Sequence, residues 1–213
     1  MKKKALSERM NGNSKAWLEA ASRWRLLSLL FQLPTRQSRH ELRRLAEIAP
    51  LNLSLLAHEW ASVPLHLAAA EYHRALGPGG VPAVESSYDP NALAGRGPLL
   101  ADIAAFHKAF SYSPEHPPAE VPDHLAAELD FLSYMAVKVA FAIEAGKIEH
   151  AKISDQAYSK FLNEHLLTWV GAFRERLEHS ASEFFIRAAD CIPASGINVP
   201  SLRKMPRLVQ IHH

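Results

Sequence analysis

Three residues with acid–base side chains lie together where a long helix is expected to begin. In the stretch VPDHLAAELDFLSYM, residues 121–135, they are Asp123, His124 and Glu128. His124 and Glu128 are four residues apart, so a helix places both on one face. Carboxylates and imidazoles can transfer protons, bind metal ions or pair with cations. A plainer role is also open, because a carboxylate is favourable near a helix N-terminus and His124 and Glu128 can form a polar pair.

The chain shows little sign of catalytic chemistry. A metal-dependent hydrolase would need more ligands than His124 and Glu128, and His107 and His165 are the candidates for completing such a site. The single cysteine, Cys191, cannot form an intramolecular disulfide and has no nucleophile motif around it. Phosphate-binding, HExxH and GxSxG motifs do not occur. We therefore predict a protein that is not an enzyme and binds no cofactor or metal.

Composition narrows the class of protein further. The 213 residues carry 24 basic and 22 acidic side chains, a net charge of +2, which is too balanced to favour nucleic-acid binding. The basic start MKKK is followed by polar residues rather than an apolar run, so we expect no secretory signal peptide. The sequence contains no run of about 18 apolar residues, so we expect no membrane span. The expected location is the cytoplasm.

The spacing of apolar residues predicts an all-α fold, a bundle of roughly eight helices. Ser38 and Glu41 are spaced as a capping box for the second helix, and Gly146 suits the left-handed position that ends a helix. The expected helices span residues 16–33, 38–48, 51–60, 64–76, 99–111, 123–146, 154–179 and 181–191.

Proline and glycine divide the chain into parts. Residues 15–112 form an N-terminal helical part that contains a Gly/Pro-rich loop at 77–98, and residues 123–205 form a C-terminal helical part. We expect the two parts to pack as one compact domain. The remaining segments are a disordered N-terminus at 1–14, a Pro-rich hinge at 113–122 and a tail at 206–213.

Five elements in this order resemble the TorD/DmsD family, the cytoplasmic redox enzyme maturation proteins related to the NarJ-type chaperones. Each element is weak alone, but together they cover roughly residues 16–190. They are LLSLLFQLP at 26–34, the ES-x-Y element Glu85-Ser86-Ser87-Tyr88, the short helix at 99–111, the PDH-[LI]-xxEL-x-F element at 122–131, and the FxxxHLxxW element from Phe161 to Trp169.

The resemblance implies an all-α chaperone that binds the twin-arginine (Tat) signal peptide of a molybdenum-dependent oxidoreductase subunit. Such proteins hold the precursor until its cofactor is inserted, and some also contact the apo catalytic subunit. Guanine nucleotide binding has been proposed for the family, but the missing phosphate motifs do not favour it here. The resemblance allows either a monomer or a domain-swapped homodimer.

The same resemblance assigns candidate signal-peptide-binding residues. Asp123, Glu128 and Glu85 would face the peptide arginines, because carboxylates bind guanidinium groups well. His124 would position Asp123 or contact the peptide backbone. Ser86 and Tyr88 would line the groove or hold the loop in place. A metal-dependent hydrolase and a helical scaffold without a peptide groove remain the alternatives.

Overall fold

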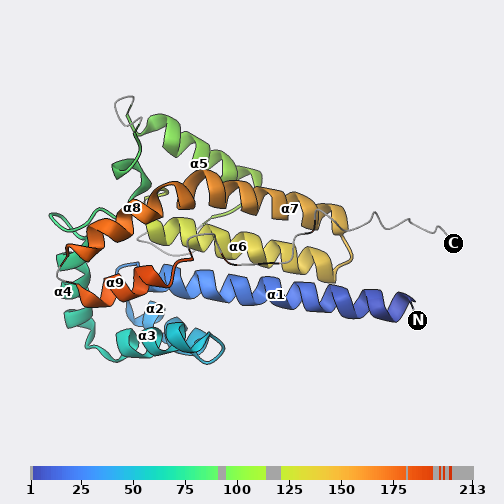
Figure 1. Cartoon of the computed structure of the whole chain (residues 1–213), viewed down its shortest axis with the longest axis horizontal. Coiled ribbons are helices and arrows are strands. Elements are labelled where there is room, and N and C mark those ends of the chain that lie inside the picture. Colours follow the sequence, from blue (N-terminus) through green and yellow to red (C-terminus); the bar gives the residue numbers. More distant parts are fainter. Residues whose placement is uncertain are drawn as a thin grey trace.

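The computed structural model describes residues 2–90, 95–113, 121–180, 182–193, 197, 199 and 202, with side chains from residue 12 onward. Helices make up the fold (Figure 1). They are α1 (Lys2–Leu30), α2 (Arg36–Ala46), α3 (Leu51–Ser62), α4 (Leu65–Leu76), the 3-10 turn η1 (Glu85–Ser87), α5 (Gly97–Ala109), α6 (Leu125–Glu144), α7 (Ile148–Phe161), the π-helical turn η3 (Leu162–Leu166), α8 (Leu167–Glu178) and α9 (Glu183–Asp190). The prediction of an all-α bundle is confirmed.

The core is centred on α1 and α6, which lie side by side with α7 against the other side of α6 (Figure 1). In α1, buried Trp17, Trp24 and Leu27 recur on one face, as the helical period requires. Trp24 also donates an indole hydrogen bond of 2.8 Å to the Tyr158 hydroxyl on α7. The N-terminal and C-terminal helical parts therefore share one hydrophobic core.

Two serines connect the central helices through their hydroxyl groups. Ser28 Oγ on α1 donates to the carbonyl of Ala126 on α6 at 2.8 Å, and Ser133 Oγ on α6 donates to the carbonyl of Ala21 on α1 at 2.9 Å. Both serines are buried. Breaking either bond would leave a buried polar group without a partner, which is unfavourable. The two bonds therefore hold α1 and α6 in one position along each other.

Replacing Ser28 with alanine is expected to lower the free energy of unfolding by about 1 kcal/mol, the usual net contribution of a buried hydrogen bond. Urea unfolding measures this difference. Ser22→Ala is the matched control, because the Ser22 hydroxyl bonds to the Leu18 carbonyl within the same helix. If both variants lose the same stability, the bond between α1 and α6 is not the cause.

Three features differ from the helices predicted from sequence. Residues 2–14, predicted to be a disordered N-terminus, continue α1, consistent with the good helix formers in KKKALSERM. Thr35, rather than Ser38, is the N-cap of α2, and Ser38 provides the reciprocal bond of the capping box. The helix expected at 154–179 begins earlier, at Ile148, and is interrupted by the π-helical turn η3.

The segment after α6 agrees with its predicted turn. Gly146 has a φ of 68°, the left-handed conformation that glycine adopts without a steric penalty. Of the Pro-rich hinge predicted at 113–122, residues 114–120 lie outside the described residues, as does the tail at 206–213. Among the described residues no strand occurs, and the only bridge of β type joins Val84 to His124.

Candidate functional site

The loop before α5 is attached to the start of α6 by backbone hydrogen bonds. The Glu85 amide donates to the Asp123 carbonyl at 2.8 Å, and the Leu125 amide donates to the Ala83 carbonyl at 2.8 Å. These bonds flank the bridge between Val84 and His124. The ES-x-Y element and the PDH element, far apart in the chain, are therefore neighbours in the structure.

Asp123 is a buried carboxylate with a cation beside it. Its side chain has no exposed surface, whereas the side chain of Arg96 is half exposed. One guanidinium nitrogen of Arg96 donates to both carboxylate oxygens, at 2.9 and 3.1 Å. The Ser86 amide lies 3.3 Å from Oδ2 as a further donor. Burial makes an unpaired carboxylate costly, so this charge depends on these partners.

His124, rather than Asp123, caps α6. Its ring Nδ1 accepts a hydrogen bond from the Ala126 amide at 3.1 Å. Its Nε2 lies 3.5 Å from the hydroxyl of Tyr72 on α4. The imidazole is buried, so it contributes to the helix start and to the contact with α4.

Glu128 and Glu85 lie beside one another in the interior and use different partners. Trp169 on α8 donates its indole N–H to Glu128 Oε2 at 3.1 Å. His165 in η3 holds Glu85 Oε2 at 3.0 Å through Nδ1. Asp102 of α5 lies 3.2 Å from the other ring nitrogen of His165. The cluster thus joins the loop, α6 and the η3–α8 segment.

Of the two glutamates, Glu128 is the one whose surroundings raise the pKa and so favour the protonated form. Complete burial, and then the charge of Glu85, raise the pKa of Glu128 well above its ordinary value. Its Oε1 is buried without an N–H or O–H donor. A protonated Glu128 resolves this, because it donates a hydrogen bond to Glu85 instead of competing with it for donors.

The raised pKa of Glu128 predicts a specific pH dependence. A group whose pKa is higher in the folded state contributes stability below its unfolded pKa and loses it as pH rises through its folded pKa. Glu128→Gln keeps the hydrogen-bonding shape without the titration. We expect the variant to gain stability relative to the parent as pH rises above about 4.3, the pKa of a glutamate in the unfolded chain, because only the parent has a proton to lose there.

Urea unfolding of the two proteins across this range measures the effect. Subtracting the parent from the variant removes the contribution of the other carboxylates. Two pH profiles that stay parallel would contradict a proton held on Glu128.

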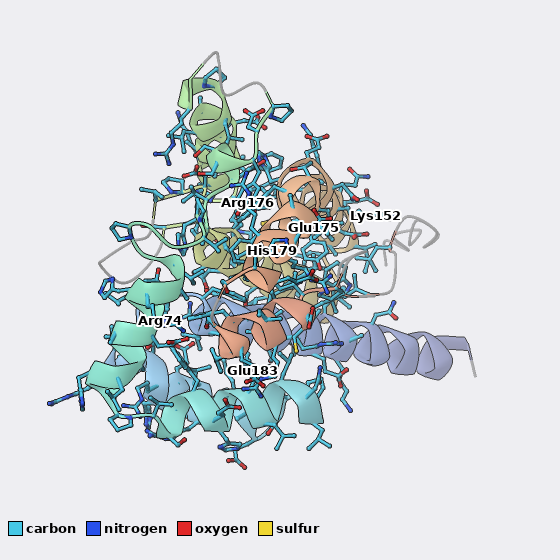
Figure 2. All side chains as sticks on the ribbon, turned by 60° about the vertical axis from the view of Figure 1, so that its left-hand side comes forward. Arg74, Lys152, Glu175, Arg176, His179 and Glu183 are labelled. Atoms are coloured by element: carbon cyan, nitrogen blue, oxygen red, sulfur yellow. The ribbon has the colours of Figure 1, made fainter. Side chains whose placement is uncertain are left out.

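Tyr88 anchors the other end of the ES-x-Y element. Its hydroxyl donates to the Pro82 carbonyl at 2.8 Å, and its ring lies 5.3 Å from that of Trp169. The guanidinium of Arg176, labelled in Figure 2, lies over the ring at 4.3 Å. Cation–π contact of this kind is favourable. Tyr88 therefore holds the loop against α8.

The structure brings all six predicted site residues into one region around the loop and the start of α6. It also adds three that sequence reasoning did not assign to the signal-peptide site: Arg96, His165 and Trp169. The FxxxHLxxW element contains the latter two and was the available signal. No local pattern marks Arg96, because its partner is 27 residues away.

The histidines proposed as metal ligands do not form such a site in the described part of the chain. There, no three His, Cys, Asp or Glu side chains are arranged to hold a metal ion. His107 lies against the rings of Tyr112 and Phe131. Burial, and then the nearby His165, lower the pKa of His107 to about 4.

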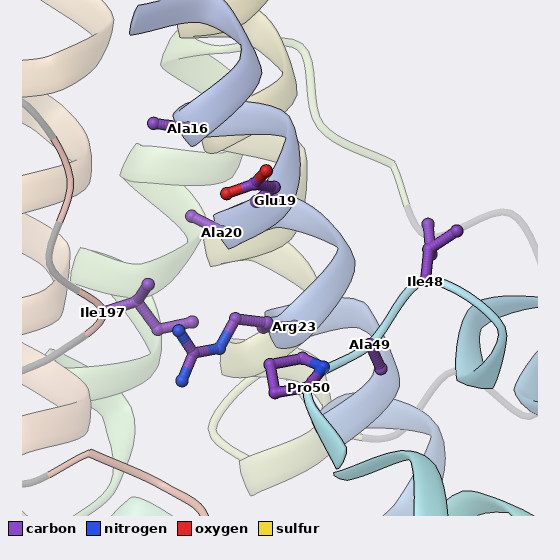
Figure 3. Close-up of a pocket in the computed structure, with 8 residues that line it drawn as sticks. All are labelled: Ala16, Glu19, Ala20, Arg23, Ile48, Ala49, Pro50 and Ile197. Carbon is purple, nitrogen blue, oxygen red and sulfur yellow. The ribbon is translucent and has the colours of Figure 1, made fainter. Parts of the chain in front are cut away.

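A separate hollow of about 320 Å³ lies between α1 and the α2–α3 corner (Figure 3). None of the six predicted site residues lines it. Its walls are Ala16, Glu19, Ala20, Arg23, Ile48, Ala49, Pro50 and Ile197.

The described helices include none that is long and apolar enough to cross a membrane.

Comparison with known proteins gives consistent matches. A family model described as the nitrate reductase delta subunit matches residues 34–175, about two thirds of the chain. The chain is 32% identical over 117 residues to the selenate reductase assembly chaperone protein of Thauera selenatis, covering 54% of this chain and 60% of that protein.

Two further relatives are also named as chaperones. The chlorate reductase assembly chaperone protein of Ideonella dechloratans is 31% identical over 90 residues, or 42% of this chain and 46% of the relative. The chaperone protein TorD of Vibrio cholerae serotype O1 (strain ATCC 39315 / El Tor Inaba N16961) is 50% identical over 60 residues, or 27% of this chain and 24% of the relative. The chain thus spans less than two thirds of these relatives. No solved structure matches significantly.

Proposed function

We propose that this chain, which belongs to the nitrate reductase delta subunit family, is an assembly chaperone for a molybdenum-dependent oxidoreductase. The TorD, selenate reductase and chlorate reductase relatives confirm the resemblance to the TorD/DmsD family. All three relatives are named as chaperones, which agrees with the prediction that the chain is not an enzyme.

The proposed client is the catalytic subunit of that oxidoreductase, recognised by its twin-arginine signal peptide. The chaperone acts in the cytoplasm and holds the precursor until its cofactor is inserted and the subunit has folded. A signal peptide of this kind has a basic front followed by an apolar stretch. Its receptor therefore needs at least one carboxylate that can accept a guanidinium group.

The observation that carries this proposal is the guanidinium-bound carboxylate of Asp123. It lies in the PDH element, within the family match, and already pairs with an arginine. We assign Asp123 as the residue that receives a peptide arginine. His124 positions it by capping α6, and Ser86 donates its amide to the same carboxylate.

The remaining candidate residues hold the loop and α6 in place around the Asp123 carboxylate. Glu85 joins the loop to α6 by its backbone and to His165 by its side chain. Glu128, held protonated, is suited to supporting Glu85 rather than to binding a second arginine directly. Tyr88 holds the loop on α8 through Trp169 and Arg176.

Co-expression with a full-length precursor tests the function. A molybdoenzyme precursor from the same genome is produced with and without this chain, and molybdenum per purified enzyme is measured. We expect the chain to co-purify with the precursor and to increase its metal content. The control is the same precursor without its signal peptide. Equal capture of both forms would contradict recognition of the signal peptide.

A further inference from the structure

We propose that Arg96 is an internal competitor for the signal peptide: its guanidinium occupies Asp123 and must leave before a peptide arginine binds there. This inference rests on the proposed function and adds a regulatory contact to the same site. The ligand class is a guanidinium cation, supplied by this chain in the resting state and by the client in the complex.

The carboxylate of Asp123 already has one cation against both of its oxygens. The carboxylate is fully buried, and a single guanidinium nitrogen of Arg96 contacts both oxygens at 2.9 and 3.1 Å. The Ser86 amide lies against one of those oxygens. In the proposed exchange, a peptide guanidinium takes the place of Arg96 on these two oxygens.

The buried charge also requires an occupant. Removing one partner from a desolvated ion pair leaves an uncompensated charge, which is strongly unfavourable. Asp123 is thus expected to exchange one arginine for another rather than to stand empty. This exchange makes peptide binding weaker than the contact alone would allow, because the peptide must first displace Arg96.

Arg96 can leave without disrupting a helix. It precedes α5 at the N-cap position, where its side chain makes no capping hydrogen bond. Half of the side chain is exposed to solvent, so the guanidinium can be hydrated again by a change of rotamer. Asp123, in contrast, is held by the backbone bridge to the loop. The mobile partner of the pair is therefore the arginine.

The test is calorimetric titration of a synthetic twin-arginine signal peptide into the parent, Arg96→Ala and Arg96→Gln. If Arg96 occupies the site about nine times in ten, its removal tightens the apparent Kd by roughly tenfold. Arg96→Gln keeps a neutral donor beside Asp123 and guards against a folding defect. Arg187→Ala removes an arginine that is about as exposed as Arg96 but pairs with an exposed carboxylate, Glu59, and it should leave the Kd unchanged.

The gain is expected to disappear in an Asp123→Asn background, because no charge remains for the two arginines to share. Unchanged or weaker binding by both Arg96 variants, with the parent still binding the peptide, would overturn the competition and leave the proposed function intact. Tightening that persists in the Asp123→Asn background would also overturn it.

If neither the parent nor any variant binds the peptide, a measurement without peptide tests the guanidinium site at Asp123 separately from the proposed function. Thermal unfolding of Arg96→Ala is then followed with added methylguanidinium or methylammonium chloride. A rise in Tm with methylguanidinium alone, absent in the parent, would support a guanidinium site at Asp123 although the proposed function had failed. No selective rise would overturn the site as well.

Discussion

Replacing Asp123 with asparagine is expected to weaken the binding of a twin-arginine signal peptide by at least about thirtyfold. The substitution keeps the size of the side chain and an oxygen that can accept from the Ser86 amide, but it removes the charge. Truncating a desolvated charge pair costs about 2–5 kcal/mol, and 2 kcal/mol corresponds to roughly a thirtyfold change in Kd. Isothermal titration measures the difference directly.

The control for this variant is Asp190→Asn. Asp190 also pairs with an arginine, Arg174, but its side chain is more than half exposed and lies on α9. It should retain parental affinity. Thermal unfolding of both variants establishes that they fold. A folded Asp123→Asn protein with parental affinity would remove Asp123 from the proposed site.

Replacing Phe131 with alanine is expected to have the largest effect on stability, a loss of roughly 3–5 kcal/mol. Phe131 is fully buried on α6. Its ring lies 4.6 Å from that of Phe161, 4.9 Å from His107 and 5.2 Å from Tyr112. The ring therefore fills the space between α5, α6 and the end of α7. Its removal leaves a cavity that these neighbours cannot close.

Phe141→Ala is the matched control on the same helix. The Phe141 side chain is 59% exposed, so its truncation should change the free energy of unfolding by no more than about 0.5 kcal/mol. Urea unfolding of both variants measures the contrast. A loss below about 1 kcal/mol for Phe131→Ala would mean that this aromatic cluster does not stabilise the core as described.

The sequence was most informative where packing follows a simple period. Trp17, Trp24 and Leu27 recur at helical spacing and are all buried, so the first helix and the all-α class could be predicted. The exact form of the C-terminal helices could not. The π-helical turn inserts one additional residue into a turn, and the sequence around His165 shows the same apolar period that a continuous helix would have.

The candidate residues could be named from the sequence, but their contacts could not. The two elements that contain Glu85 and Asp123 were recognised by resemblance, and the structure places them side by side. Their partners depend on long-range geometry. Arg96 reaches Asp123 from a Gly/Pro-rich loop, and His165 reaches Glu85 across 80 residues of chain. Neither pairing leaves a periodic signal in the sequence.

The burial of the charged site residues could not be predicted from the residue types either. Charged side chains are rarely fully buried unless they are paired, so Asp123 and Glu128 were expected on a surface. Both have no exposed surface. Asp123 keeps a paired arginine, whereas burial raises the pKa of Glu128 and so favours its neutral form.

The most direct test of the proposed function is isothermal titration of the purified chain with a synthetic twin-arginine signal peptide and with its twin-lysine counterpart. A lysine ammonium is more strongly hydrated than a guanidinium and lacks its planar set of donors. The account predicts saturable one-to-one binding of the twin-arginine peptide, weakened at least about tenfold, or ~1.4 kcal/mol, by the lysine change. Equal binding of both peptides, or binding of neither by the folded chain, would contradict it.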